Sequence, residues 1–441
     1  MKSTRHRFGL DFGTSNTSLA VADGSSARVL PIDPVVGATM PTLLYVRRDA
    51  STYVGRPAID LYLADQRERG PIRREVKLLG VALPSSDNKS ARPVEAHILA
   101  DLSSPGRLFR SLKSFLGSSL DPRTSVFGSE MSLTGLVAIV LEHVRRRAVE
   151  LTGEEPSSIR IGRPVEFVGG PSVEAMALAR LEEAARLAGF RGVAFEPEPV
   201  AAARAASVGE GNTLVFDFGG GTLDLAITHR SGSDVRVVAT AGRGVAGDRF
   251  TQVLIDLLVA PHLGAGVTWG EKRLRLPAFI TGAISDWHQL SALNEKAILD
   301  ALDDLVRAGA PRRELSALRS AIELQLGYEI FAAVDAVKIE LSGEDVAVFA
   351  FHHDEVDVDA VVPRRRFELR ARPLLDEIDA LVSEVLARAD LAAADVAEVV
   401  LTGGSSALPA ARALVARRFP GAARRDHAAF SSVALGLALG G

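Results

Sequence analysis

The sequence predicts an α/β fold that is built from two duplicated halves. One strand–turn–strand segment occurs twice, in residues 9–21 and again in residues 215–227. Each copy opens a run with the same order of elements, namely strands, an inserted segment and helices. The chain has 441 residues, of which 47% are hydrophobic and 24% are charged, as is ordinary for a globular protein. At ~150 residues each, this length makes three units.

The repeated segment is a hairpin whose turn suits an anion. The first copy reads GLDFGTSNTSLAV and the second reads VFDFGGGTLDLAI; with a shift of 206 positions their Asp, Phe, Gly, Leu and Ala coincide. Glycine lets backbone N–H groups approach an anion, successive N–H groups form a nest, and aspartate can hold a metal ion through water. A plain turn is the alternative for one copy, but a second copy in register argues against it. Two facing hairpins would hold the phosphates of a nucleotide from both sides.

The first half is predicted to contain strands, a small inserted lobe and helices. Apolar spacing and turn residues predict, in order, a hairpin over about 7–22, a strand at 43–46, an inserted lobe over about 50–125, a helix over 132–151, a strand at 159–165, a helix over 172–189, a strand at 193–195 and a helix from 200 to 206. Ser172 is the expected N-cap of its helix and Gly189 its stop, while Pro199 precedes the last helix.

The second half repeats this order. Its expected elements are a hairpin at 213–228, a loop at 242–248, a helix over 249–258, a mostly helical stretch over 260–345 that includes 297–307 and 314–341, strand character over 346–362, a helix over 367–389, a buried strand at 396–401, a helix over 408–419 and a final helix over 431–439. We therefore expect one lobe over 1–208, with its core in 1–48 and 125–208 around an inserted subdomain at about 49–124. The other lobe is expected over 209–441, with its core in 209–242 and 373–441 around an inserted subdomain at about 243–372.

Composition excludes several classes of function. The net charge of −4 leaves no basic surplus for nucleic-acid binding. The chain has no cysteine, which excludes disulfides and thiol chemistry. No run approaches ~18 uninterrupted apolar residues, and the polar, basic start does not resemble a signal peptide. We expect a cytoplasmic protein without a membrane or nucleic-acid partner.

A third motif lies near the end of the second half. Residues 399–409 read VVLTGGSSALP, which predicts a strand, a Gly403-Gly404 turn and a helix. Paired glycines let a flat ring or a ribose lie against the backbone, and a helix N-terminus adds a positive dipole end. Ser405 or Ser406 is expected to cap this helix, with Pro409 in its first turn. Many strand–helix turns contain glycine, so the motif alone is weak evidence for a binding site. Its position at the far end of the second half strengthens the prediction.

Together these motifs resemble the ATPase domain of the DnaK-like seventy-kilodalton heat-shock chaperones, in the actin-like ATPase superfamily. The short YegD-like homologues look most similar, and like them the chain is expected to lack a peptide-binding domain. The resemblance spans nearly the whole chain and implies an α/β actin-like ATPase fold. Such a fold has two duplicated lobes with mixed five-stranded-type sheets and two smaller inserted subdomains. It also implies ATP or ADP with Mg²⁺ as cofactors, K⁺ as a further candidate ion, and an unidentified protein partner or client.

The resemblance also implies roles for individual residues. In segment 108–117, Lys113 would reach the γ-phosphate and the attacking water; in segment 196–203, Glu198 would join the metal–water network. The implied catalytic set is Lys113, Glu198, Asp217 and Thr222. The implied Mg²⁺ set, acting mainly through water, is Asp11, Asp217 and Asp224. The implied nucleotide set is Asp11, Gly13, Thr14, Ser15, Asn16, Gly219, Gly220, Gly221, Gly247, Asp335, Lys338, Ser342, Gly403, Gly404 and Ser405.

The chain departs from the family pattern at several nucleotide positions. Ile339 and Ala407 stand where the family places two arginines that sandwich adenine. Each lost guanidinium plane removes about 0.5–2 kcal/mol of stacking. Asp335 replaces a glutamate, Ala246 replaces a glycine of the ribose loop, and Phe430 replaces an acidic residue. We expect weaker nucleotide affinity or looser base selectivity than in the chaperones.

The function that these residues favour is a slow ATPase or nucleotide-dependent conformational switch that a partner protein reads. Its halves would rotate about the connection at residues 198–203, and hydrolysis would rest on positioning and electrostatics. An actin-like filament-forming ATPase and a nucleotide-binding pseudo-ATPase scaffold are the alternatives. A small-molecule kinase would need a catalytic aspartate in a sugar-binding cleft, and no segment fits that description.

Overall fold

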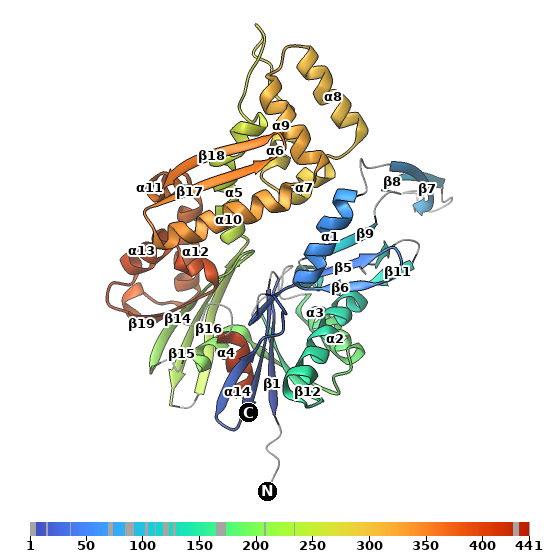
Figure 1. Ribbon diagram of the computed structural model, residues 1–441. Helices are drawn as coiled ribbons and strands as arrows, with labels where there is room; N and C mark the ends of the chain where they lie inside the picture. Colours follow the sequence, from blue (N-terminus) through green and yellow to red (C-terminus); the bar gives the residue numbers. More distant parts are fainter. Residues whose placement is uncertain are drawn as a thin grey trace.

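The computed structural model describes residues 6–14, 16–35, 37–68, 74–83, 92–101, 105–110, 112–117, 123–126, 129–164, 173–206, 209–232, 234–426 and 432–440. Within them the chain forms two lobes, each with a central sheet. Helices α4 (Glu198–Ala205) and α14 (Ser432–Leu439) lie between the two sheets (Figure 1). None of the described helices is long and apolar enough to cross a membrane.

The first sheet combines an antiparallel hairpin with parallel strands. Its strand order is β13-β12-β1-β2-β3, and β4 also pairs with β2. The strands are β1 (Arg7–Phe12), β2 (Asn16–Asp23), β3 (Ser26–Leu30), β4 (Thr39–Pro41), β12 (Ser158–Arg163) and β13 (Gly192–Pro197). The hairpin β1–β2 is antiparallel, and β12 joins β1 in parallel.

The second sheet repeats this arrangement. Its order is β16-β15-β14-β19-β20, with strands β14 (Gly211–Phe218), β15 (Leu223–Ser231), β16 (Asp234–Arg243), β19 (Val396–Thr402) and β20 (Ala423–Asp426). The registers also agree, because Asp11 lies opposite Ser18 and Asp217 lies opposite Asp224, each shifted by 206 positions. The predicted duplication and the mixed sheets are therefore confirmed. The proposed division of the chain at residue 208 stays a prediction.

The helices of the first lobe begin and end at identifiable signals. In α2 (Leu133–Thr152), the Ser132 side chain accepts a hydrogen bond from the N–H of Gly135, and Gly153 ends the helix in the left-handed region, with φ 72°. Helix α3 (Glu174–Leu187) packs against α2 and stops before Gly189, whose φ is +98°. The expected cap Ser172 lies outside the described residues.

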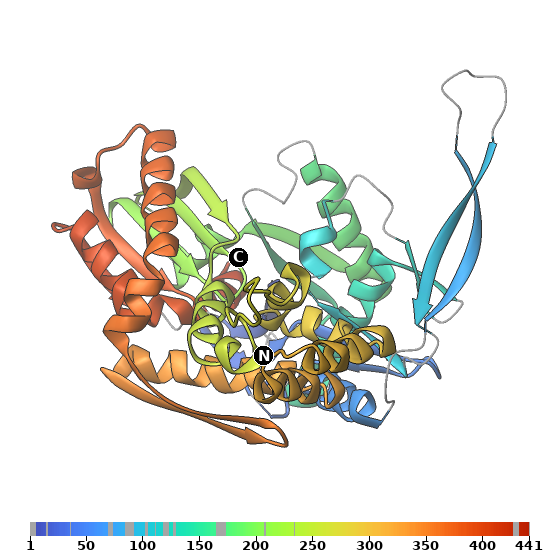
Figure 2. The same cartoon turned by 90° about the horizontal axis from the view of Figure 1, so that it is seen from above.

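The inserted segment of the first lobe is richer in strands than its composition indicated. The strand predicted at 43–46 is confirmed as β5 (Leu43–Arg47), just before this segment. After it come β6 (Thr52–Val54), α1 (Arg56–Glu68), β7 (Arg74–Leu83), β8 (Arg92–Asp101), β9 (Gly106–Arg110), the 3-10 helix η1 (Leu112–Phe115), β10 (Arg123–Val126) and β11 (Ser129–Ser132). Strands β6, β5 and β9 form one sheet. The ribbon β7–β8 projects from the body of the molecule at the right of Figure 2.

The inserted segment of the second lobe is mostly helical, as expected. It contains α5 (Gly247–Leu258), η3 (Ala260–Leu263), α6 (Ala278–Ile284), α7 (Trp287–Ala292), α8 (Lys296–Arg307), α9 (Arg312–Glu323), α10 (Gly327–Gly343), β17 (Val346–His353) and β18 (Val356–Pro363). The single helix expected over 314–341 is wrong. The chain breaks between α9 and α10 at Gln325, whose φ of 58° no α-helix accommodates.

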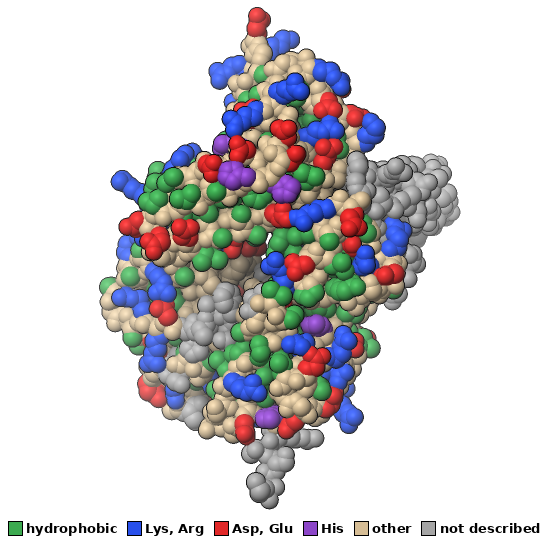
Figure 3. Space-filling view, viewed as in Figure 1, with side chains coloured by type: hydrophobic (Ala, Val, Ile, Leu, Met, Phe, Trp, Pro, Cys, Tyr) green, Lys and Arg blue, Asp and Glu red, His purple; other side chains and the backbone are tan. Residues whose placement is uncertain are grey.

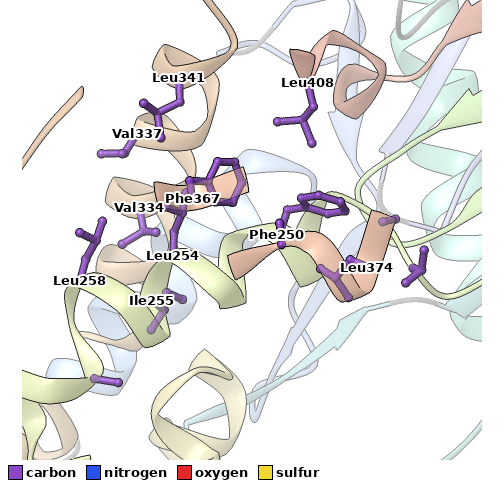
Figure 4. Packing of buried hydrophobic residues seen from close by; sticks show 14 of the residues in the cluster. Phe250, Leu254, Ile255, Leu258, Val334, Val337, Leu341, Phe367, Leu374 and Leu408 are labelled. Carbon is purple, nitrogen blue, oxygen red and sulfur yellow. The ribbon is translucent and has the colours of Figure 1, made fainter. Parts of the chain in front are cut away.

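After these insertions the chain returns to the second sheet through α11 (Arg364–Arg370), α12 (Arg372–Ala389), η4 (Ala393–Asp395), η5 (Gly404–Ala407) and α13 (Pro409–Arg418). Figure 4 shows Phe367 of α11, Leu374 of α12 and Leu408 beside buried side chains of α5 and α10. The rings of Phe218 and Phe250 lie 5.7 Å apart between centroids, and those of Phe250 and Phe367 lie 6.2 Å apart. An aromatic chain therefore ties the end of β14 to α5 and α11.

Two helices cross at a close glycine contact between the sheets. Helix α14 packs on β1 and β2, so the last helix of the second half covers the sheet of the first half. Helix α4 places Ala201 and Ala202 against Val215 and Ala226 of the second sheet. A Cβ atom on Gly436 would lie 1.8 Å from the carbonyl oxygen of Ala201. Only glycine lets these two backbones approach so closely.

Candidate functional site

A buried lysine–glutamate pair lies at the meeting point of the two lobes. Lys113 of η1 donates a hydrogen bond from Nζ to Oε1 of Glu198, the first residue of α4, at 2.5 Å. Their side chains are 9% and 17% exposed. Lys113 belongs to the inserted segment of the first lobe and Glu198 begins helix α4, yet the fold brings their side chains together. The face in Figure 3 is hollowed near its centre, between the upper and lower parts of the molecule.

The charges of three aspartates at the two hairpin tips interact with this lysine–glutamate pair. Burial raises the pKa of Asp11 to about 7, and the charge of Glu198 adds to the effect. Burial and the charge of Glu198 raise the pKa of Asp224 to about 6. Burial, with the charges of Asp224 and Asp11, holds the pKa of Asp217 well above its ordinary value. The three buried carboxyl groups therefore have too little positive charge nearby to stabilise their ionised forms.

The ammonium of Lys113 compensates only part of this charge. Burial alone would lower the pKa of Lys113, but the charges of Glu198 and Asp11 outweigh burial and raise it. Asp217 and Asp224 lie directly opposite each other on β14 and β15, a placement in which like charges repel. The hydroxyl of Thr222 hydrogen-bonds to Asp224 and partly offsets the rise of its pKa. The donor set of oxygen atoms and the excess negative charge fit Mg²⁺, which prefers carboxylates and retains waters.

We expect the stabilisation by Mg²⁺ and ADP to grow as the pH rises from about 5.5 to 8. The raised pKa values of Asp11 and Asp224 mean that protons favour the metal-free fold. The stabilisation of the metal-free fold by these protons is complete below the ordinary carboxyl pKa of 3.8, and it is lost as pH rises through the raised pKa values of about 6 and 7. A metal ion must displace these protons at low pH. Thermal midpoints with and without Mg²⁺–ADP across this range test the expectation, and a shift that is equal at every pH would contradict it.

Both hairpin tips close with the same backbone hydrogen bond. The N–H of Gly13 donates to the carbonyl of Asn16 at 3.0 Å, and the N–H of Gly219 donates to the carbonyl of Thr222 at 3.1 Å. A Cβ atom on Gly13 would lie 2.3 Å from the oxygen of Asn16, so the first turn requires glycine. Thr14 lies inside this turn, while Ser15 lies outside the described residues.

Two carbonyl groups of the second hairpin tip accept hydrogen bonds from the start of α5. Gly247 N–H donates to the carbonyl of Gly219 at 3.1 Å, and Asp248 N–H donates to the carbonyl of Gly220 at 2.8 Å. Among the described residues, no acceptor takes the N–H groups of Gly220 and Gly221. Such unpaired successive N–H groups can form an anion nest.

A polar network connects α5 with α10 beside this tip. Lys338 Nζ donates to Oδ1 of Asp335 at 2.5 Å, to Oγ1 of Thr251 at 2.9 Å and to the carbonyl of Gly247 at 3.3 Å. The structure thus brings together the predicted residues Gly247, Asp335 and Lys338. Ser342 lies one turn further along, and its hydroxyl donates to the carbonyl of Lys338.

Thr251 is a member of this network that the sequence reading missed. Its hydroxyl donates to Asp335 Oδ1 at 2.7 Å and is fully buried. The sequence contained a signal for this role, because Thr251 follows Gly247 by one helical turn and therefore lies on the same face of α5. Its hydroxyl holds Asp335 and Lys338 in place beside the Gly247 loop.

The Gly403-Gly404 turn packs directly against the second hairpin. Gly403 has a φ of +80°, and its Cβ atom would lie 2.3 Å from the carbonyl oxygen of Phe218 and 2.8 Å from Oδ1 of Asp217. Gly404 begins η5. No side chain fits at Gly403 without moving the backbone beside Asp217.

The expected capping role of Ser405 and Ser406 is wrong. The Ser405 hydroxyl donates to the carbonyl of Gly219 at 2.7 Å, and the Ser406 hydroxyl donates to the carbonyl of Gly403 at 2.7 Å. The N-cap position of α13 is Leu408, which makes no side-chain cap bond. The reason is that η5 intervenes between the glycine turn and α13, so Ser405 bonds to the hairpin tip and Ser406 to the glycine turn instead of the helix end.

The positions that lack the two family arginines are open to solvent. Ile339 is 64% exposed on α10, and Ala407 is exposed at the end of η5. Neither supplies a cation for stacking. Ala246 is buried immediately before α5, and Phe430 lies outside the described residues.

The inserted segments of the two lobes also touch each other. Arg67 of α1 forms an ion pair with Glu329 of α10. The ring of Tyr62 lies 6.5 Å from that of Trp287, and the guanidinium of Arg110 lies 5.9 Å from the Trp287 ring centre. These contacts bridge the lobes at a second place, away from α4 and α14.

The model of the Hsp70 protein family matches residues 121–291 and 323–441, which is well over half of the chain. The matched segments include Glu198, the second hairpin, the Lys338 network and the Gly403-Gly404 turn. The first hairpin and Lys113 precede them, and α8 with almost all of α9 falls between them. Together with the duplicated mixed sheets, this match shows that the chain belongs to the Hsp70 family and has the actin-like ATPase fold.

Proposed function

We propose that this Hsp70-family protein is a magnesium-dependent nucleotide switch. It binds ATP and ADP between its lobes, hydrolyses ATP slowly, and presents the resulting change of shape to a protein partner. The observation that carries the proposal is the buried Lys113–Glu198 pair beside three aspartates with raised pKa values at equivalent hairpin tips. Membership of the family supports a nucleotide-dependent, chaperone-like ATPase.

The two hairpin turns and the Gly403-Gly404 turn would bind the nucleotide. The turn at Gly13–Asn16 and the N–H groups of Gly220 and Gly221 would hold phosphate oxygens, with Gly219 shaping the second turn. Gly247, Asp335, Lys338 and Ser342 would border the ribose and base on one side. Gly403, Gly404 and Ser405 would border them on the other side.

The acidic residues would hold Mg²⁺, which supplies positive charge beside the phosphates. Asp11, Asp217 and Asp224 would do so mainly through water. Lys113 would place its ammonium on the terminal phosphate and orient the attacking water. Glu198 fixes that ammonium from the other side, and Thr222 orients Asp224. Catalysis of this kind depends on positioning and electrostatic stabilisation, so no covalent intermediate is required.

The contacts between the lobes would make the site responsive to its ligand. Nucleotide that touches both hairpins favours the closed arrangement, in which Arg67 meets Glu329 and Tyr62 meets Trp287. Loss of the terminal phosphate weakens that preference and allows the lobes to rotate about α4 and α14.

Isothermal titration with ADP and ATP, with and without Mg²⁺, tests the proposal. Magnesium-dependent binding at micromolar or tighter affinity, with phosphate release from ATP, is the expected result. Binding without phosphate release would identify a pseudo-ATPase scaffold. The absence of binding at millimolar nucleotide would overturn the proposal.

We also expect little preference for adenine over guanine nucleotides. Ile339 and Ala407 offer no stacking cation, whereas Ile339→Arg and Ala407→Arg should each tighten ADP binding by about 2- to 30-fold through cation–π stacking. Both positions are exposed, so the longer side chains need no space in the core. Competition titrations of ADP against GDP measure the effect.

Leu187→Arg is the matched control, because Leu187 is 63% exposed at the end of α3. This variant should leave nucleotide affinity unchanged. A wild-type protein that already prefers adenine strongly, or arginine variants without any gain, would show that the base binds elsewhere.

A further inference from the structure

A surface groove on the second lobe lies between the pair α11–α12 and α13. Its volume is about 740 Å³. Apolar side chains line its floor, among them Leu375 and Leu414, and Leu369 is 74% exposed, the highest fraction of any large hydrophobic side chain in the described ranges. A single exposed leucine is ordinary on a protein surface, so the case for a binding surface rests on its position beside this groove and on the charges around it.

The charge around this groove is unbalanced. Arg365 and Arg417 lie on opposite walls, and neither forms an ion pair with any described residue. Three acidic side chains line the groove. Asp376 is paired with Arg372 at 3.3 Å and Asp379 with Arg418 at 3.4 Å, while Glu368 forms no ion pair within the described part of the chain. The unpaired charges on the walls are therefore two arginines and one glutamate, which leaves a net positive charge.

The outer face of α11 adds to this positive charge. Arg366 and Arg370 are exposed, lie one helical turn apart and form no ion pair within the described part of the chain. Like charges at this spacing destabilise a helix. An acidic partner would relieve this repulsion, and arginine is enriched among the residues that dominate protein interfaces.

Both walls of the groove are anchored at the nucleotide site. Helix α13 follows η5 and the Gly403-Gly404 turn. On the other wall, Phe367 points from α11 toward Phe250 of α5 (Figure 4), and Phe250 contacts Phe218, the neighbour of Asp217. A movement of either nucleotide loop is thus coupled through rigid packing to one wall of the groove.

We infer that this groove binds an acidic segment of a partner protein, with an apolar side chain of that segment seated on Leu369. The basic walls select negative charge and exclude basic segments, while the leucine floor supplies the apolar contact. Docking itself goes beyond the nucleotide switch. Any dependence of docking on ADP or ATP rests on the proposed function.

Selection of short random peptides displayed on phage, with the full chain as bait, tests the inference. We expect the selected peptides to be rich in Asp and Glu around a leucine or aromatic residue, and to bind more weakly as salt rises. The double variant Arg365→Glu/Arg417→Glu and the single variant Leu369→Ser should each weaken binding of the selected peptides by about tenfold or more.

Arg313→Glu is the matched control, because Arg313 is an exposed arginine on α9, with 77% of its side chain accessible. It should leave peptide binding unchanged. All the exchanged side chains are on the surface, so thermal midpoints should stay near that of the wild type. Leu369→Ala, which keeps the helix propensity, replaces Leu369→Ser if that variant unfolds.

Three outcomes would overturn the inference. They are selected peptides that are neutral or basic, acidic peptides whose binding is unaffected by the groove variants, and a change in oligomeric mass that shows the groove to contact a second copy. ADP titration of the same preparations separates this result from the switch itself. Intact ADP binding without groove-dependent peptides rejects the groove alone, and groove-dependent peptides without ADP binding reject the switch alone.

Discussion

Replacing Lys113 by alanine is expected to lower ATP turnover by about 100-fold or more while changing ADP affinity only a few-fold. The Lys113 side chain is 9% exposed, and its ammonium is held at 2.5 Å from Glu198. In the proposed function it would therefore be pre-organised for charge that develops on the transferred phosphate. The diphosphate would be held by the hairpin amides, which the substitution leaves in place. Single-turnover phosphate release and ADP titration measure the two effects separately.

Removal of a buried cation also leaves Glu198 without its partner, which costs stability. Thermal melts of Lys113→Ala with ADP bound will show whether the fold survives, and Lys113→Gln provides a longer replacement that can still hydrogen-bond to Glu198. Lys296→Ala is the matched control, because that side chain is 80% exposed on α8. Turnover that stays at the wild-type rate in folded Lys113→Ala would remove this residue from the catalytic set.

Replacing Gly436 by alanine is expected to lower the free energy of unfolding by about 3 kcal/mol or more. The new methyl group would lie 1.8 Å from the carbonyl oxygen of Ala201, so α4 and α14 must separate. Helix propensity alone predicts the opposite sign, since alanine favours a helix over glycine by about 1 kcal/mol. Urea denaturation of the two proteins determines which effect is larger. Because α4 begins at Glu198, the same variant should also loosen the Lys113–Glu198 pair.

Gly282→Ala is the control for this test. Gly282 lies within α6, and an added Cβ atom would meet nothing within 4 Å. This variant should gain about 0.5–1 kcal/mol from reduced backbone freedom. If Gly436→Ala were as stable as Gly282→Ala, the close crossing of α4 and α14 would not exist in solution.

The sequence was most informative where one short segment contains all the necessary physics. The two hairpins could be recognised because an apolar strand, an aspartate, a glycine turn and a second strand follow one another directly. The shift of 206 positions predicted two equivalent hairpins, and the structure gives both the same register, with Asp11 opposite Ser18 and Asp217 opposite Asp224. Glycine at position 403 was equally readable, because a positive φ restricts the residue type wherever the neighbouring strands lie.

Several features depended on contacts that no local pattern encodes. The strands β16 and β20 and those that follow β5 in the first inserted segment were missed or left unassigned, since a strand is stabilised by partners distant in the chain. The break at Gln325 was missed because the apolar spacing on either side continues as in one helix. Ser405 and Ser406 looked like helix caps by type, and the carbonyl of Gly219, 186 residues away from Ser405, decided otherwise.

The sequence alone therefore determined the duplicated halves, the glycine turns and the residue types that we propose for phosphate and metal. The tertiary structure decided which of them meet. It brought Lys113 to Glu198, placed Thr251 beside Asp335 and Lys338, and laid α14 across the sheet of the other half. The reason is physical: turn geometry and side-chain chemistry act over a few residues. The burial and mutual repulsion that raise the pKa values of Asp11, Asp217 and Asp224 arise only when separate segments pack together.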